Sequence, residues 1–147
     1  MNEIFLDLLR LKSKGYCCAQ IVIILALEAQ GKSNPDLVRS MGGLCFGINW
    51  SGEVCGALLG GVSLLALYGG KGMDDETPDP DYQRMTAELV EWFRVFTDEA
   101  CGGRRCSDIL DKFPDHSMCG RIVVDTYGKC LEILKRNGLD PAVGRNG

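Results

Sequence analysis

Eight cysteines give this chain most of its capacity for chemistry. In a sequence of 147 residues they are Cys17, Cys18, Cys45, Cys55, Cys101, Cys106, Cys119 and Cys130. This density is well above ordinary usage, and a chain that is 46% hydrophobic can build a core without a scaffold of disulfides. In a reducing compartment, so many cysteines indicate metal binding or redox chemistry.

Most of these thiols are expected where helices begin. Four of the seven helices that the sequence predicts carry cysteine near the N-terminal end, namely Cys17 and Cys18, Cys55, Cys106, and Cys119. Unpaired N–H groups and the helix dipole place roughly half a positive charge there, which lowers the pKa of a thiol. The resulting thiolate can act as a nucleophile or a metal ligand, whereas core packing gives no reason for this placement.

The other cysteines are less informative. Cys130 lies on an apolar stripe in the middle of a predicted helix, and we interpret it as a core residue. Cys45 lies in a glycine-rich loop and could be either a core residue or a functional thiol. Cys101 forms a C-x4-C pair with Cys106, a spacing that is weak evidence for a site. The sequence has no C-x2-C motif, so neither a thioredoxin-type motif nor a zinc ribbon is indicated.

Helix signals dominate the chain, and strand signals are nearly absent. The apolar periodicity predicts longer helices over residues 3–11, 17–30, 52–68, 82–100 and 118–136, and short ones over 35–41 and 106–112. Pro35 fits the first position of its helix, and Ser51 and Ser117 are predicted as N-caps. We expect an all-α fold, a single-domain helical bundle over residues 1–138 followed by a loose tail over 139–147.

A stripe of small residues follows Cys55. Gly56 and Gly60 lie one turn apart on the same helix face, beside Ala57 and Gly61. Such a face allows another backbone, or a bulky inorganic group, to approach closely. Spacing alone favours tight helix packing over a bound group, so Gly56 and Gly60 are candidate cofactor-binding residues with packing as the favoured alternative.

Charge and hydropathy exclude several classes of partner. The net charge of −4 gives no general attraction to nucleic acid or to an anionic membrane. The longest apolar stretch, residues 54–68, is shorter than the ~20 residues that cross a bilayer, and the first residues are acidic rather than basic. We therefore expect a cytoplasmic protein.

The aromatic stripe with Trp92 and Phe96 suggests either core packing or a homo-oligomer face.

Four segments of the chain resemble a known family. They are residues 15–20, 52–61, 106–110 and 119–123, and residues 55–60 read Cys-Gly-Ala-Leu-Leu-Gly. In order and spacing they resemble the C_GCAxxG_C_C family, which has four characteristic cysteines, the second in a CGAxxG motif. The resemblance places these at Cys18, Cys55, Cys106 and Cys119, while Cys17, Cys45, Cys101 and Cys130 depart from the pattern. It implies an all-helical redox protein with an iron–sulfur centre.

Three functions compete on this evidence. In the first, Cys18, Cys55, Cys106 and Cys119 hold an iron–sulfur cluster that exchanges electrons with a redox partner. In the second, the protein is a metal-free thiol–disulfide oxidoreductase with Cys18 or Cys55 as the catalytic nucleophile. In the third, the same four thiolates form a structural zinc site. His116 could ligate a metal or hold a proton for Cys119, but we interpret it as a solvent-exposed loop residue.

Overall fold

The computed structural model describes residues 3–145, and over that range the protein is all-α. The helices are α1 (Glu3–Ser13), α2 (Cys18–Ala29), α3 (Pro35–Met41), α4 (Cys45–Ile48), α5 (Gly56–Gly69), α6 (Tyr82–Cys101), α7 (Cys106–Lys112) and α8 (Cys119–Arg136), with a 3-10 helix η1 (Gly42–Leu44) before α4. Within residues 3–145 there is no strand, only an isolated bridge between Val54 and Arg105. The predicted all-α class is confirmed.

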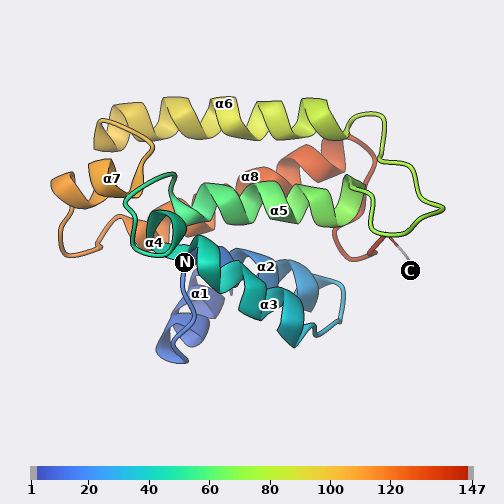
Figure 1. Ribbon diagram of the computed structural model, residues 1–147, viewed down its shortest axis with the longest axis horizontal. Helices are drawn as coiled ribbons and strands as arrows, with labels where there is room; N and C mark the ends of the chain where they lie inside the picture. Colours follow the sequence, from blue (N-terminus) through green and yellow to red (C-terminus); the bar gives the residue numbers. More distant parts are fainter. Residues whose placement is uncertain (1–2, 146–147) are drawn as a thin grey trace.

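Helix α5 lies in the middle of the molecule. It packs against α2, α6 and α8, and Figure 1 shows α6 along one edge, with α1, α2 and α3 on the opposite side. The reason is in the sequence, because α2 and α5 are apolar on nearly all sides and must be enclosed, whereas α6 and α8 are amphipathic and cover them. Phe93 on α6 is fully buried in this core, while Trp92 and Phe96 are half-buried.

Two predicted N-caps are wrong. Helix α5 begins at Gly56 with Cys55 as its N-cap, so Ser51 caps nothing. Residues 51–55 instead bond to the segment before α7, since Cys55 N–H donates to Arg104 O and Cys106 N–H donates to Glu53 O. Helix α8 begins at Cys119 with Met118 as its N-cap and no side-chain cap bond. At α5 the long-range backbone bonds override the local capping signal. Before α8, Ser117 N–H donates instead to the Asp115 side chain at 3.0 Å.

Other predicted boundaries agree with the structure. Helix α3 begins at Pro35, as expected, and the Asn34 side chain accepts a hydrogen bond from Leu37 N–H at 3.1 Å. Helices α6 and α7 lie within one residue of their predicted ranges. None of the helices within residues 3–145 is both long and apolar enough to span a bilayer.

The C-terminal segment has specific contacts as far as the structure describes it. The Tyr68 hydroxyl donates to Pro141 O at 2.6 Å, and Pro141 is buried. Arg145 forms an ion pair with Glu76 at 3.3 Å. Residues 139–145 of the expected loose tail therefore pack against the end of α5 and the loop after it, and residues 146–147 lie outside the described range.

Candidate thiol cavity

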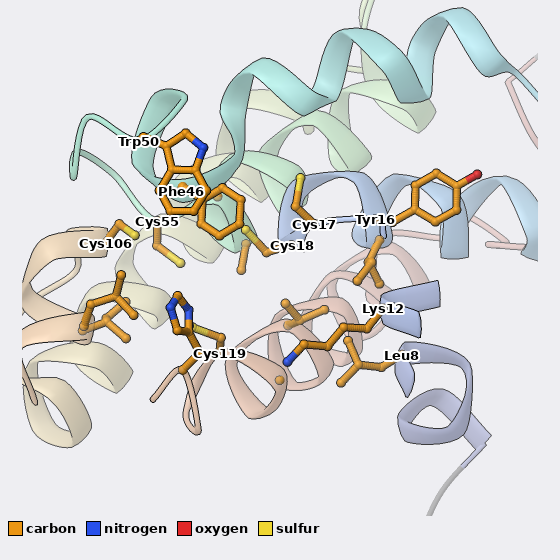
Figure 2. Close-up of a pocket in the computed structure, with 18 of the residues that line it drawn as sticks. Leu8, Lys12, Tyr16, Cys17, Cys18, Phe46, Trp50, Cys55, Cys106 and Cys119 are labelled. Carbon is orange, nitrogen blue, oxygen red and sulfur yellow. The ribbon is translucent and has the colours of Figure 1, made fainter. Parts of the chain in front are cut away.

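Four cysteines from four helices line one cavity. The cavity has a volume of about 470 Å³, and Figure 2 shows Cys18, Cys55, Cys106 and Cys119 around the same open space. Cys18, Cys106 and Cys119 are the first residues of α2, α7 and α8, and Cys55 is the N-cap of α5. The cysteines that the family resemblance selects are thus brought together although up to 101 positions separate them in the sequence.

Glycines on α5 allow this convergence. A Cβ atom on Gly56 would lie 2.5 Å from Cys18 Sγ and 3.0 Å from Leu44 O, so the glycine makes room for the Cys18 thiol. Gly56 also lines the cavity. Gly60 does not, because its face meets α2, where a Cβ would lie 3.0 Å from Val22 Cβ and 3.1 Å from the Ala19 backbone. The small-residue stripe therefore serves both the cavity and the close packing of α2 on α5.

Burial raises the pKa of every cavity thiol. For Cys55, burial is the largest cause and repulsion by the Cys18 thiolate is the next largest, and together they raise the pKa to about 12. Burial, with smaller repulsion from Cys18 and Cys106, raises the pKa of Cys119 to about 11. The pKa values of Cys18 and Cys106 are also raised, chiefly by burial.

The helix-start effect predicted from the sequence is present but weaker than burial. The N–H groups of Ala57 and Leu58 hydrogen-bond the Cys55 sulfur and lower its pKa, and those of Phe46 and Ala19 do the same for Cys18. Because desolvation of the charged form is larger, the expected lowering of the thiol pKa is wrong in sign. Without a compensating positive charge, these cysteines are protonated at neutral pH.

Several lining residues were not assigned to the site from the sequence. Lys12 at the end of α1 contributes a positive charge that lowers the pKa of Cys119. His116 is half-buried rather than solvent-exposed, and its Nδ1 lies 3.9 Å from Cys119 Sγ. Phe46 and Trp50 stack with their ring centroids 3.8 Å apart at the edge of the cavity (Figure 2).

A left-handed turn, which includes residues 46–48 of the short element α4, carries the two stacked rings. Five consecutive residues have positive φ angles, namely Phe46 (57°), Gly47 (65°), Ile48 (62°), Asn49 (48°) and Trp50 (71°). The left-handed region costs about 1–2 kcal/mol for each residue other than glycine, and a β-branched residue such as Ile48 rarely adopts it. No sequence propensity predicts such a turn, which explains why Phe46 and Trp50 were missed.

The other four cysteines lie in different environments. Cys17, at the N-cap of α2, is joined to Cys45 by a disulfide. Cys130 is fully buried and its thiol donates to Gly61 O at 3.6 Å, which confirms the interpretation as a core residue. Cys101 is buried at the end of α6 and does not line the cavity.

The cavity thiols do not converge on one point. Within residues 3–145, no three His, Cys, Asp or Glu side chains lie close enough to share a single metal ion. The arrangement differs from a preformed tetrahedral site, in which every ligand lies ~2.3 Å from the same ion. It is compatible with a group of several metal ions, in which each thiolate binds its own metal.

Comparisons with known proteins found a family model and a relative that match most of the chain. The family model described as "Putative redox-active protein (C_GCAxxG_C_C)" matches residues 16–133, a range that contains all four cavity cysteines. An "Uncharacterized protein" of Archaeoglobus fulgidus is 31% identical over 124 residues, which cover 81% of this chain and 78% of that protein. No solved structure matches the chain. The family match spans most of the sequence, and the chain therefore belongs to the C_GCAxxG_C_C family of redox-active proteins.

Proposed function

We propose that this protein is an electron carrier in which Cys18, Cys55, Cys106 and Cys119 hold an iron–sulfur cluster. The observation that carries the proposal is the cavity of about 470 Å³ lined by these four thiols from four separate helices. Four thiolates complete the ligation of a two-iron or a four-iron centre. When bound, the cluster would supply one-electron redox chemistry.

The residues around the thiols fit such a group. Ile21, Ala57 and Val123 give the cavity apolar walls, which restrict water near the sulfurs. The N–H groups of Leu58 and Phe46 hydrogen-bond the sulfurs of Cys55 and Cys18, respectively. Hydrogen bonds to sulfur and low solvent exposure are the features by which a protein adjusts the potential of a cluster.

The geometry supports a cluster over a structural zinc ion. Zinc requires all four sulfurs at ~2.3 Å from one ion, and in the described part of the chain no three His, Cys, Asp or Glu side chains are placed to hold a single metal ion. A cluster distributes its ligands over different iron atoms, so thiols around a wide cavity suit it better.

Burial also argues against the metal-free oxidoreductase with Cys18 or Cys55 as the nucleophile. The attacking species in thiol–disulfide exchange is the thiolate. With a pKa of about 12, Cys55 is ionised to only about one part in 10⁵ at pH 7. A bound metal centre removes this obstacle, since coordination deprotonates a thiol outright.

Anaerobic reconstitution with iron and sulfide tests the proposal. We expect a brown protein with stoichiometric iron and sulfide, whose visible absorption is bleached by dithionite. Serine substitution at any of the four cavity cysteines should lower the iron content, whereas the matched control Cys101→Ser, a buried cysteine outside the cavity, should retain it. A colourless protein that cannot be reconstituted contradicts the proposal, and stoichiometric zinc without a redox response would favour the structural zinc site.

A further inference from the structure

A disulfide between Cys17 and Cys45 lies beside the thiol cavity. Neither of its cysteines belongs to the four that the family resemblance selects. Cys17 precedes Cys18 and lines the cavity, and Cys45 immediately precedes the left-handed turn of residues 46–50. The bond therefore ties the N-terminal end of α2 to the beginning of this turn. Cys17 is half-buried and Cys45 is 2% exposed, so a reductant that enters the cavity meets the Cys17 sulfur first.

Besides the disulfide, three backbone hydrogen bonds are made by carbonyl groups of residues 45–48. Asn49 N–H donates to Cys45 O at 2.8 Å, Ser51 N–H to Ile48 O at 3.2 Å and Glu53 N–H to Gly47 O at 3.0 Å. The Phe46 and Trp50 rings stack, but Trp50 is 69% exposed and the side chains of Ile48 and Asn49 are also exposed. Because four residues other than glycine adopt left-handed conformations, breaking the covalent tie would favour relaxation of the turn.

The same turn closes over the cavity thiols. Phe46 and Trp50 both line the cavity, and the Phe46 N–H hydrogen-bonds the Cys18 sulfur. Gly47 packs so closely that an added Cβ would lie 2.7 Å from Cys106 Cβ. Movement of residues 46–50 would therefore change the surroundings of two of the four cavity cysteines and the access to all of them.

We propose that Cys17 and Cys45 form a second redox centre, a disulfide that dithiols reduce and that controls closure of the 46–50 turn over the thiol cavity. One thiolate of the dithiol attacks Cys17 Sγ, the sulfur–sulfur bond breaks, and Cys45 leaves and takes up a proton. The second thiol of the dithiol then displaces Cys17. Two electrons and two protons pass to the protein, which gains two thiols, while the dithiol becomes a disulfide.

The test uses the full chain in its metal-free form, so its outcome is independent of cluster binding. Non-reducing peptide mapping of the oxidised protein should show a peptide pair linked through Cys17 and Cys45, which dithiothreitol abolishes. After reduction, we expect alkylation of Cys18 by iodoacetamide and amide hydrogen exchange at residues 46–50 to become at least tenfold faster. The wild-type protein in its two states supplies this comparison even if variants fail to fold.

Two variants separate the disulfide from general effects of the reductant. Cys45→Ala should show the fast rates with or without dithiothreitol, because the tie is absent in both conditions. Cys130→Ala, which removes a buried thiol on α8, should keep the response of the wild type. Absence of the linked peptide after air oxidation overturns the proposal, and so do equal alkylation and exchange rates in the oxidised and reduced proteins.

Discussion

Gly56 offers the sharpest test of how the cavity is built, through the variant Gly56→Ala. The new Cβ would lie 2.5 Å from Cys18 Sγ and 3.0 Å from Leu44 O. The thiol can rotate away, but the carbonyl belongs to the backbone and cannot, so α5 must shift. Overpacking of this kind costs about 1–3 kcal/mol, and alanine returns at most about 1 kcal/mol as a better helix former. We therefore expect a net loss of about 1–2 kcal/mol in the free energy of unfolding.

Urea unfolding of the reduced, metal-free protein measures this loss, and iron content after reconstitution reports the displacement of Cys18 from the cavity. Gly128→Ala is the matched control, since Gly128 lies in the middle of α8, is exposed, and its added Cβ would meet nothing within 4 Å. It should raise the free energy of unfolding by up to about 1 kcal/mol and leave the iron content unchanged. If Gly56→Ala is as stable as Gly128→Ala and binds full iron, the reasoning about the cavity is refuted.

Two further predictions concern packing and pH. Gly60→Ala should lower the free energy of unfolding by about 1 kcal/mol in the same urea assay, because its Cβ would meet Val22 Cβ at 3.0 Å and the Ala19 backbone at 3.1 Å. Stabilisation equal to that of Gly128→Ala would show that α2 and α5 are not in close contact there. Burial raises the pKa of Cys130 from 9.0 to about 12, so the folded protein keeps this proton while the unfolded chain begins to lose it near pH 9. The contribution is complete below pH 9 and is lost as the pH rises to about 12, at about 1.4 kcal/mol per pH unit. Urea unfolding at pH 8 and pH 10 should therefore show a smaller alkaline loss for Cys130→Ala than for the wild type, and identical losses would contradict the assignment.

Local sequence signals located the helices well and their first residues less well. Apolar periodicity is a property of a single segment, so α6 and α7 could be placed from it alone. The beginning of α5 could not, because residues 51–55 form backbone hydrogen bonds with residues 104–106, about fifty positions away in the chain. Ser51 has a side chain suited to capping a helix, but it does not cap α5 because its segment is hydrogen-bonded to residues 104–106 instead.

The candidate site, too, could be predicted only in part from the sequence. The cysteines at the helix starts were visible in the sequence because a helix start is a local feature, and the family resemblance selected the four that line the cavity. The direction of the pKa shifts could not be predicted from the sequence, because desolvation depends on which apolar walls the fold assembles around each thiol. The Cys17–Cys45 disulfide was equally hidden, since eight cysteines allow many pairings and the turn after Cys45 contradicts the preferences of Phe46 and Ile48.

The apolar surroundings of the thiols connect the chemistry to the fold. A cavity that keeps Cys55 and Cys119 protonated gives poor nucleophiles, and it gives good ligands only to a group whose positive charge offsets the loss of hydration. Among the described residues that line the cavity, Lys12 carries a full positive charge and the helix starts contribute partial ones. That total is too small for four free thiolates. Deprotonation would therefore have to accompany the binding of the proposed metal centre. The same burial that argues against metal-free catalysis by these cysteines is thus consistent with the proposed cluster.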